Sequence, residues 1–194
     1  ACLAEMFLGN GNNHPNFLYI YFGAFIGGAI VLNGQLFNPD LKYTSSIGTI
    51  PINLGSGYKQ LLEIASLNSL EQDLKKNGYD SKLLIMEKEL PTEVQRMFDS
   101  WAEQALEGIK WSILSINSVI NTNLVIFDGH LSENLLNEIN LKLKNLLKDL
   151  KWEGTEPVSL EKGTIGINAR ALGSAIIPFN NLYGLSQSTL LKKN

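Results

Sequence analysis

The sequence is poor in the side chains that usually bind metal ions or form cross-links. Its 194 residues include one cysteine, Cys2, and two histidines, His14 and His130. A single cysteine excludes an internal disulfide framework and a thiolate zinc site, because each requires several sulfur atoms. The absence of disulfides is typical of a reducing compartment. We therefore expect a cytoplasmic protein with no metal and no other cofactor.

A strong charge of either sign and a long apolar segment are also absent. The net charge of -3 and the pI near 5.4 give no basic surface for nucleic acid, which is bound through clustered lysine and arginine. No apolar run approaches the length needed to cross a bilayer, and no signal sequence opens the chain. The length and the 44% of hydrophobic residues suit one well-buried domain without a membrane partner.

The first residues do not have the features of a natural chain start. The segment ACLAEMFLG has helical apolar spacing and a terminal glycine, but neither an initiator methionine nor a capping residue precedes it. We expect the chain to be the C-terminal part of a longer protein. Within it, residues 1–184 are expected to form one subdomain, and residues 185–194 a frayed tail.

The apolar stretch 17–37 predicts three antiparallel strands. Phe17–Phe22 is typical of a strand buried on both faces, and Asn33-Gly34 favours a tight type I′ turn before the third strand. We place Gly27 and Gly28 in the turn between the first two strands, where a ligand phosphate would fit. A plain hairpin with small residues for packing explains the same spacing.

Two amphipathic helices follow. The first is expected over Tyr58–Asn77, with leucines on one side and Gly78 as its left-handed cap. The second is expected to begin with a capping box formed by Thr92 and Gln95 and to bury one face as far as Ile120.

A parallel crossover unit is predicted after the long helix. Leu124–Phe127 reads as a strand, and Ser132 as the N-cap of the next helix. Asp128 and Gly129 end the strand, at the position where α/β proteins tend to bind ligands. The alternative is that Asp128 only helps to cap the helix. A short strand near residues 158–160 and a helix rich in small residues over 163–184 complete the pattern.

The order of these segments resembles the C-terminal half of the ROK family, which comprises repressors, open reading frames and sugar kinases. The resemblance covers residues 1–184 and is carried by ACLAEMFLG, FGAFIGGAIVLNGQLF, SSIGTIPI, LLEIASLNSLEQDL, LVIFDGHLS and GTIGINARALGSAIIPF. It implies the actin-like, ribonuclease-H-like ATPase fold: an α/β protein whose mixed sheet has an antiparallel three-stranded meander followed by parallel strands, flanked by helices. Within the family, these segments are most similar to those of ROK transcriptional regulators, rather than to those of the kinases.

The sequence departs from the family at its sugar and zinc motifs. Members that bind sugar carry Gly-Glu-Ile-Gly-His where this chain has residues 45–49, so Ser46 replaces the sugar-contacting glutamate and Thr49 the zinc-binding histidine. NLGSGYKQ stands in place of the three-cysteine zinc loop, so zinc is not expected. The family's catalytic aspartate would precede Ala1, so no catalytic residue is assigned. The candidate ligand-binding residues are Gly27, Gly28, Ser46, Thr49, Asp128 and Gly129.

The resemblance implies one function and leaves two alternatives open. We expect the effector-sensing and dimerisation portion of a ROK transcriptional regulator that responds to a sugar or sugar phosphate. It would act as a homodimer and contact DNA only through an upstream domain that lies outside this chain. One alternative is the C-terminal lobe of an ATP-dependent sugar kinase. Another is an interaction module in which the long helix from Thr92 supplies a dimer face.

Overall fold

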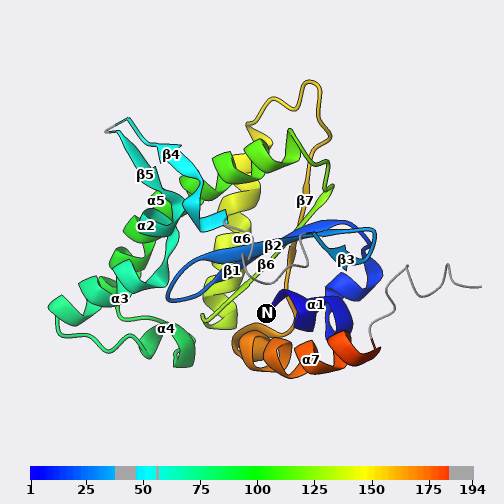
Figure 1. Ribbon diagram of the computed structural model, residues 1–194. Helices are drawn as coiled ribbons and strands as arrows, with labels where there is room; N and C mark the ends of the chain where they lie inside the picture. The colour runs from blue at the N-terminus through cyan, green and yellow to red at the C-terminus, as the bar shows by residue number, and fades with distance from the viewer. Residues whose placement is uncertain (38–46, 56, 184–194) are drawn as a thin grey trace, which may run out of the picture.

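The computed structural model describes residues 1–37, 47–55 and 57–183, and its centre is a five-stranded mixed sheet (Figure 1). The strand order is β3-β2-β1-β6-β7. Strands β1, β2 and β3 are antiparallel neighbours, whereas β6 and β7 run parallel to β1. The meander followed by parallel strands is therefore confirmed. The strands are β1 Phe17–Phe22, β2 Gly27–Leu32, β3 Gln35–Leu36, β6 Leu124–Gly129 and β7 Ser159–Lys162.

The turn between β2 and β3 forms as the sequence predicts. Asn33 has a φ of 53° and Gly34 a φ of 73°, so both residues adopt the left-handed conformation that a type I′ turn requires. The Asn33 N–H also donates to the Asn16 side-chain oxygen at 2.7 Å. The turn thus fixes the register in which Val31 pairs with Phe17 on one side and with Leu36 on the other.

One face of the sheet packs on the larger hydrophobic core. Figure 1 shows the long helix α5 and the helix α6 lying across this face, with α2 and α3 beside α5. Alternate residues of β1 and β6, such as Ile20 and Phe127, point into this core because successive strand side chains face opposite ways. The helices are α2 Leu61–Ala65, α3 Leu67–Lys76, α5 Thr92–Asn117 and α6 Glu133–Lys148.

The opposite face is covered by α1 Cys2–Leu8 and α7 Ala169–Tyr183, which lie side by side below the sheet (Figure 1). Its core is smaller and includes Tyr19, Tyr21 and Ile126 from the strands. Two 3-10 turns, η1 Asn10–Asn13 and η3 Gly166–Asn168, connect these helices to the sheet.

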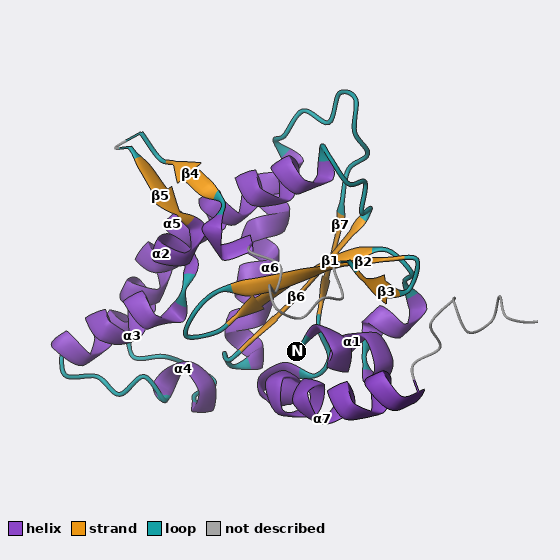
Figure 2. Ribbon diagram, viewed as in Figure 1, coloured by secondary structure: helices purple, strands orange, loops and turns teal. Residues whose placement is uncertain are grey.

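Four further elements lie outside the two helical layers. The strands β4 Pro51–Asn53 and β5 Tyr58–Gln60 form a separate hairpin that projects from the body (Figure 2). The 3-10 turn η2 Ile47–Thr49 precedes this hairpin, and the short helix α4 Leu83–Met86 follows α3. Within the described ranges, no helix combines the length and the apolarity that crossing a membrane would require.

Two helix predictions are wrong in detail. The helix expected over Tyr58–Asn77 begins with β5 and is broken at Ser66, whose extended backbone (φ −76°, ψ 141°) separates α2 from α3. The expected capping box at Thr92 does not form, because Thr92 is already helical and the N-cap is Pro91, without a side-chain hydrogen bond. The cap at Ser132 is confirmed, since its hydroxyl accepts from Leu135 N.

Candidate functional site

Most of the candidate residues meet at one edge of the sheet. The carboxyl ends of β1, β6 and β7 lie at this edge together with the start of the antiparallel β2. Tyr21 pairs with Gly27 on one side and with Asp128 on the other, so the three residues form one row across the sheet. Gly28 pairs with Ile20 in the next row. We call this region the carboxyl edge.

Gly27 and Gly28 do not lie in the turn, as the sequence analysis expected. Both are strand residues of β2, and neither has a positive φ. Gly28 instead permits a close approach: a Cβ there would collide with the Ile47 side chain and lie 2.5 Å from Tyr19 O. Because Ile47 opens η2, this contact brings η2, which ends at Thr49, against the start of β2, whereas Ser46 lies outside the described residues.

The β1–β2 loop, residues 23–26, is fastened to the break between α2 and α3. Ile26 N–H donates to Ser66 Oγ at 3.0 Å, and Ser66 Oγ donates to Leu62 O at 2.5 Å. In return, Leu67 N–H donates to Gly23 O at 3.0 Å. Ser66 is thus a site residue that sequence reasoning missed, because its apolar neighbours gave an uninterrupted helical pattern.

The same serine connects the loop to the long helix. The Trp101 indole N–H, from α5, donates to Ser66 O at 3.2 Å. The Trp101 ring also meets Phe22, the last residue of β1, edge-on, with 6.1 Å between centroids. One buried residue, Ser66, therefore bonds both the loop and α5.

Asp128 is fully buried at the end of β6. Its Oδ1 accepts from Gly129 N at 2.8 Å, and its Oδ2 accepts from Gly166 N at 2.9 Å. The alternative that Asp128 caps the following helix is wrong, because Ser132 does so. Burial raises the pKa of Asp128 and the charge of Glu5 acts in the same direction, although the two backbone hydrogen bonds oppose the shift.

A second buried carboxylate, Glu5 of α1, lies beside Asp128 and was missed by the sequence analysis. Its Oε1 accepts from Asn10 N at 2.7 Å and from Thr164 Oγ1 at 3.3 Å, and its Oε2 accepts from Thr164 N at 3.2 Å. Glu5 follows Cys2 by three residues and lies on the buried side of its helix. A carboxylate on an otherwise apolar helical stripe was the signal that could have revealed it.

Two tyrosines of β1 complete this group. The hydroxyls of Tyr19 and Tyr21 are buried and have no hydrogen-bond partner within the described part of the chain. The Tyr19 hydroxyl lies close enough to Asp128 for each to affect the other's pKa, but outside hydrogen-bonding geometry; burial, and then the Asp128 charge, raise the pKa of Tyr19. We call Glu5, Asp128, Tyr19 and Tyr21 the acidic cluster. In the ranges 1–37, 47–55 and 57–183, no group of three or more His, Cys, Asp or Glu residues is placed to hold a metal ion.

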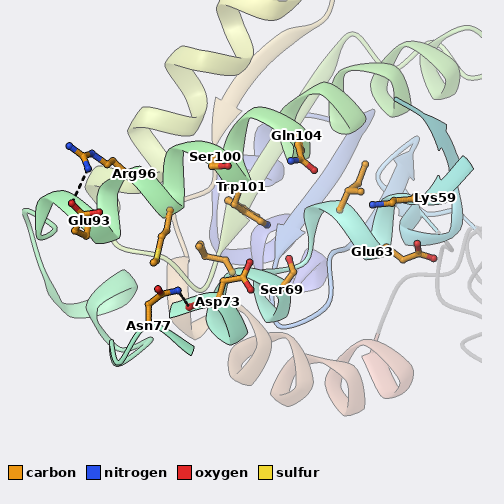
Figure 3. A pocket seen from close by; sticks show the side chains of 13 residues that line it. Lys59, Glu63, Ser69, Asp73, Asn77, Glu93, Arg96, Ser100, Trp101 and Gln104 are labelled. Carbon is orange, nitrogen blue, oxygen red and sulfur yellow. Dashed lines mark hydrogen bonds and ion pairs between the residues drawn. The ribbon is translucent and has the colours of Figure 1, made fainter. Parts of the chain in front are cut away.

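A separate groove of about 450 Å³ lies between α3 and α5 (Figure 3). Its walls carry both signs of charge, and Arg96 pairs with Glu93 at its rim at 2.9 Å. It contains none of the candidate residues, but Trp101 joins its floor to Ser66. The lining residues are Lys59, Glu63, Ile64, Ser69, Leu70, Asp73, Asn77, Glu93, Arg96, Met97, Ser100, Trp101 and Gln104.

Comparison with known proteins identifies the fold. No family model matches the sequence, and no curated protein sequence matches it. Among solved structures, a ROK hexokinase from Thermus thermophilus is similar with a TM-score of 0.62 and 19% identity, over 93% of this chain and 62% of that one. The fold is that of the ROK proteins.

Two further solved structures are similar to it. A ROK family protein from Streptococcus pneumoniae in complex with sucrose has a TM-score of 0.68 and 16% identity, over 93% of this chain and 63% of that one. A ROK transcriptional regulator, a homologue of the E. coli MLC protein, has a TM-score of 0.62 and 18% identity, over 91% of this chain and 48% of that one. The chain thus spans less than two thirds of the ROK proteins it resembles, which include both kinases and a regulator.

Proposed function

We propose that the chain is the C-terminal effector-sensing and dimerisation portion of a ROK-type transcriptional regulator, with residues 1–184 as its subdomain. Its effector would be a sugar or sugar phosphate bound at the carboxyl edge by Gly27, Gly28, Asp128 and Gly129, with Ser46 and Thr49 as the further candidate residues. DNA would be contacted only through an upstream domain. The likeness to the MLC homologue supports this reading, and so does the sucrose in the Streptococcus pneumoniae complex.

The proposal rests on one observation: Ser66 accepts hydrogen bonds from two different elements. Its hydroxyl accepts from the β1–β2 loop at Ile26, and its carbonyl accepts from Trp101 of α5. A ligand that contacts the loop would favour one arrangement of Ser66 and therefore one position of α5. Such a difference in affinity between two arrangements is what an effector needs to shift a regulator between states.

The competing proposal is the C-terminal lobe of an ATP-dependent sugar kinase, which the Thermus thermophilus hexokinase favours. Phosphoryl transfer needs a base, Mg²⁺ and a cradle for the nucleotide phosphates. Among the described residues, no group of three or more His, Cys, Asp or Glu side chains is placed to hold a metal ion, and the amides at Gly129 and Gly166 already bind a carboxylate of the protein. We keep the regulator as the first proposal and the kinase as its competitor.

Thermal unfolding of the full-length protein tests the two proposals, because a ligand that binds only the folded state raises the midpoint. The ligands are hexoses, amino sugars and their phosphates, each with and without Mg-ATP. The regulator predicts a higher midpoint with one sugar in the absence of ATP. Sugar-dependent release of ADP would instead establish the kinase. Light scattering of the same samples measures whether the protein is a homodimer.

A pair of variants tests whether Ser66 couples sugar binding to DNA affinity. Ser66→Ala should reduce the effect of the sugar on DNA affinity. Ser174→Ala removes a similar hydroxyl, whose bond to Arg170 O is exposed, and should leave that effect intact. An equal effect of sugar in wild type and Ser66→Ala would contradict the proposed coupling.

A further inference from the structure

The acidic cluster uses the backbone donors that an anionic ligand would need at the carboxyl edge. Asp128 accepts from Gly129 N and Gly166 N, and Glu5 accepts from Thr164 N and Oγ1. Amides of this kind, where a connection leaves a strand or enters a helix, are common phosphate-binding groups. Here the protein's own carboxylates already occupy them.

The β7–α7 connection holds the Asp128 carboxylate in place. A Cβ at Gly163 would lie 2.8 Å from Asp128 Cβ and 2.9 Å from its Cγ, so the backbone passes directly over the carboxyl group. Gly163 is buried, but Thr164 beside it is exposed. The two carboxylates therefore lie just below the surface at which a ligand of the carboxyl edge would bind.

Among the described residues, no side-chain cation forms an ion pair with Glu5 or Asp128, although the Ala1 ammonium is near enough for the Asp128 charge to raise its pKa against the larger, opposite effect of burial. Lys162, at the end of β7, reaches to the other face of the sheet, where it pairs with Glu133 at 2.7 Å. Arg170 of α7 is exposed and near enough to lower the pKa of Tyr21 against the larger, opposite effect of burial, but it forms no ion pair with Glu5 or Asp128. A phosphate bound here would face like charges in a setting that screens them poorly.

The hydroxyls and carboxylates of the acidic cluster suit a neutral ligand better than an anionic one. The hydroxyls of Tyr19 and Tyr21 are buried donors without a partner in the described chain, and buried polar atoms of this kind normally hydrogen-bond to a ligand or to ordered water. Carboxylates can accept from the hydroxyl groups of a sugar, whereas they repel its phosphate. The cluster therefore combines acceptors and donors without a basic side chain of its own.

We infer that the effector of the carboxyl edge is an unphosphorylated sugar, and that Asp128, supported by Glu5, excludes sugar phosphates and nucleotides from this site. The inference rests on the proposed function, because it specifies the effector of the same site. Asp128 is thus a specificity-determining residue that acts by repulsion and by occupying the Gly129 and Gly166 amides.

Titration calorimetry of the full-length protein tests this with matched pairs of a hexose and its 6-phosphate, and with pyrophosphate as a simple anion. The wild type should bind the hexose at least about tenfold more tightly than the phosphate, a ratio that one pair of like charges can produce. Asp128→Asn removes the charge at nearly constant size, and should reduce this ratio several-fold and gain affinity for pyrophosphate. Asp149→Asn, the matched control at the exposed end of α6, should change neither.

The possible failures can be told apart. If the wild type binds a sugar phosphate more tightly than the sugar, the inference is overturned while the proposed function stands. If no sugar or sugar phosphate binds any variant, the proposed function fails, and pyrophosphate alone decides: a gain in Asp128→Asn supports the exclusion of anions, and no gain overturns it. If Asp128→Asn does not fold, the wild-type ratio and the same comparison with Glu5→Gln decide in the same way.

Discussion

The face of the sheet under α5 and α6 and the face under α1 and α7 are stabilised differently. The first places Ile20 and Phe127 in one core cluster with leucines and isoleucines of five helices. The second has fewer apolar contacts, and its connections are fastened by hydrogen bonds to the buried carboxylates of Glu5 and Asp128. The apolar face provides most of the burial that stabilises the fold, whereas the polar face places charge and unpaired hydroxyls beside the candidate site.

The largest predicted effect sharpens this contrast at Phe127, which is completely buried on the α5/α6 face. Phe127→Ala should lower the free energy of unfolding by about 3–5 kcal/mol, because it removes a large side chain and leaves a cavity. Urea denaturation measures the loss. Leu141→Ala on α6, where the side chain is 63% exposed, should cost about 0.5 kcal/mol or less. Similar costs for both variants would mean that this face is not the main core.

The next effect compares two adjacent glycines of β2. Gly28→Ala should lower the free energy of unfolding by about 1–3 kcal/mol, since its Cβ meets the Ile47 side chain and the Tyr19 carbonyl. Gly27→Ala is the control, because no atom lies within 4 Å of the Cβ position there. We expect a change of about 0.5 kcal/mol or less for this variant in the same urea experiment. Equal tolerance at both positions would contradict the close packing of η2 on the sheet.

A smaller effect is expected at the junction of the loop and the helices. Ser66→Ala leaves the buried Ile26 N–H without an acceptor and should cost about 1–2 kcal/mol. Hydrogen exchange at Ile26 should accelerate at the same time. Ser174→Ala removes an exposed bond to a helical carbonyl and should change stability little. Unchanged exchange at Ile26 would show that Ser66 does not hold the loop.

The smallest predicted effect is the pH dependence of stability, which should differ between a carboxylate on one face of the sheet and a carboxylate on the other. Burial raises the pKa of Asp128 above its ordinary 3.8, so the folded state retains a proton that the unfolded state has released. Wild-type stability therefore falls as the pH rises through the window above 3.8, and Asp128→Asn removes that loss. The stability of this variant relative to wild type should increase with pH in urea titrations.

Asp99 on α5 should give a pH dependence of stability with the opposite sign. Burial opposes the shift, but hydrogen bonds and charge from Lys142 lower the pKa of Asp99 below 3.8, so it contributes stability above this value and loses it as the pH falls further. Asp99→Asn should therefore lose stability relative to wild type as the pH rises. The same slope for both variants would contradict the difference between the two environments.

The residues that sequence analysis placed correctly are those whose structure depends on near neighbours. The apolar run Phe17–Phe22, the Asn33-Gly34 turn and the Ser132 cap each act within a few residues. The same local patterns selected Gly27, Gly28, Asp128 and Gly129 as candidates, although Gly27 and Gly28 lie in β2 and not in the expected turn. Their role in binding a ligand stays a prediction.

The break at Ser66 could not be predicted in this way. The segment LLEIASLNSL has helical spacing throughout, and its interruption depends on hydrogen bonds from Ile26 and Trp101, which are 40 and 35 residues away. Helix propensity amounts to fractions of a kcal/mol per residue, so tertiary hydrogen bonds of this kind outweigh it. Because its role depends on the same long-range hydrogen bonds, Ser66 could not be selected as a site residue from the sequence.

The sequence by itself determined the strands of the main sheet as a meander followed by parallel strands, and the long helices α5 and α6, because apolar periodicity and turn chemistry act over short distances along the chain. Only the tertiary structure decided which polar groups are buried. Glu5 bonds Thr164, 159 residues later, and Asp128 bonds Gly166, 38 residues later. A carboxylate is buried only where such distant donors converge on it, and no local pattern records that convergence.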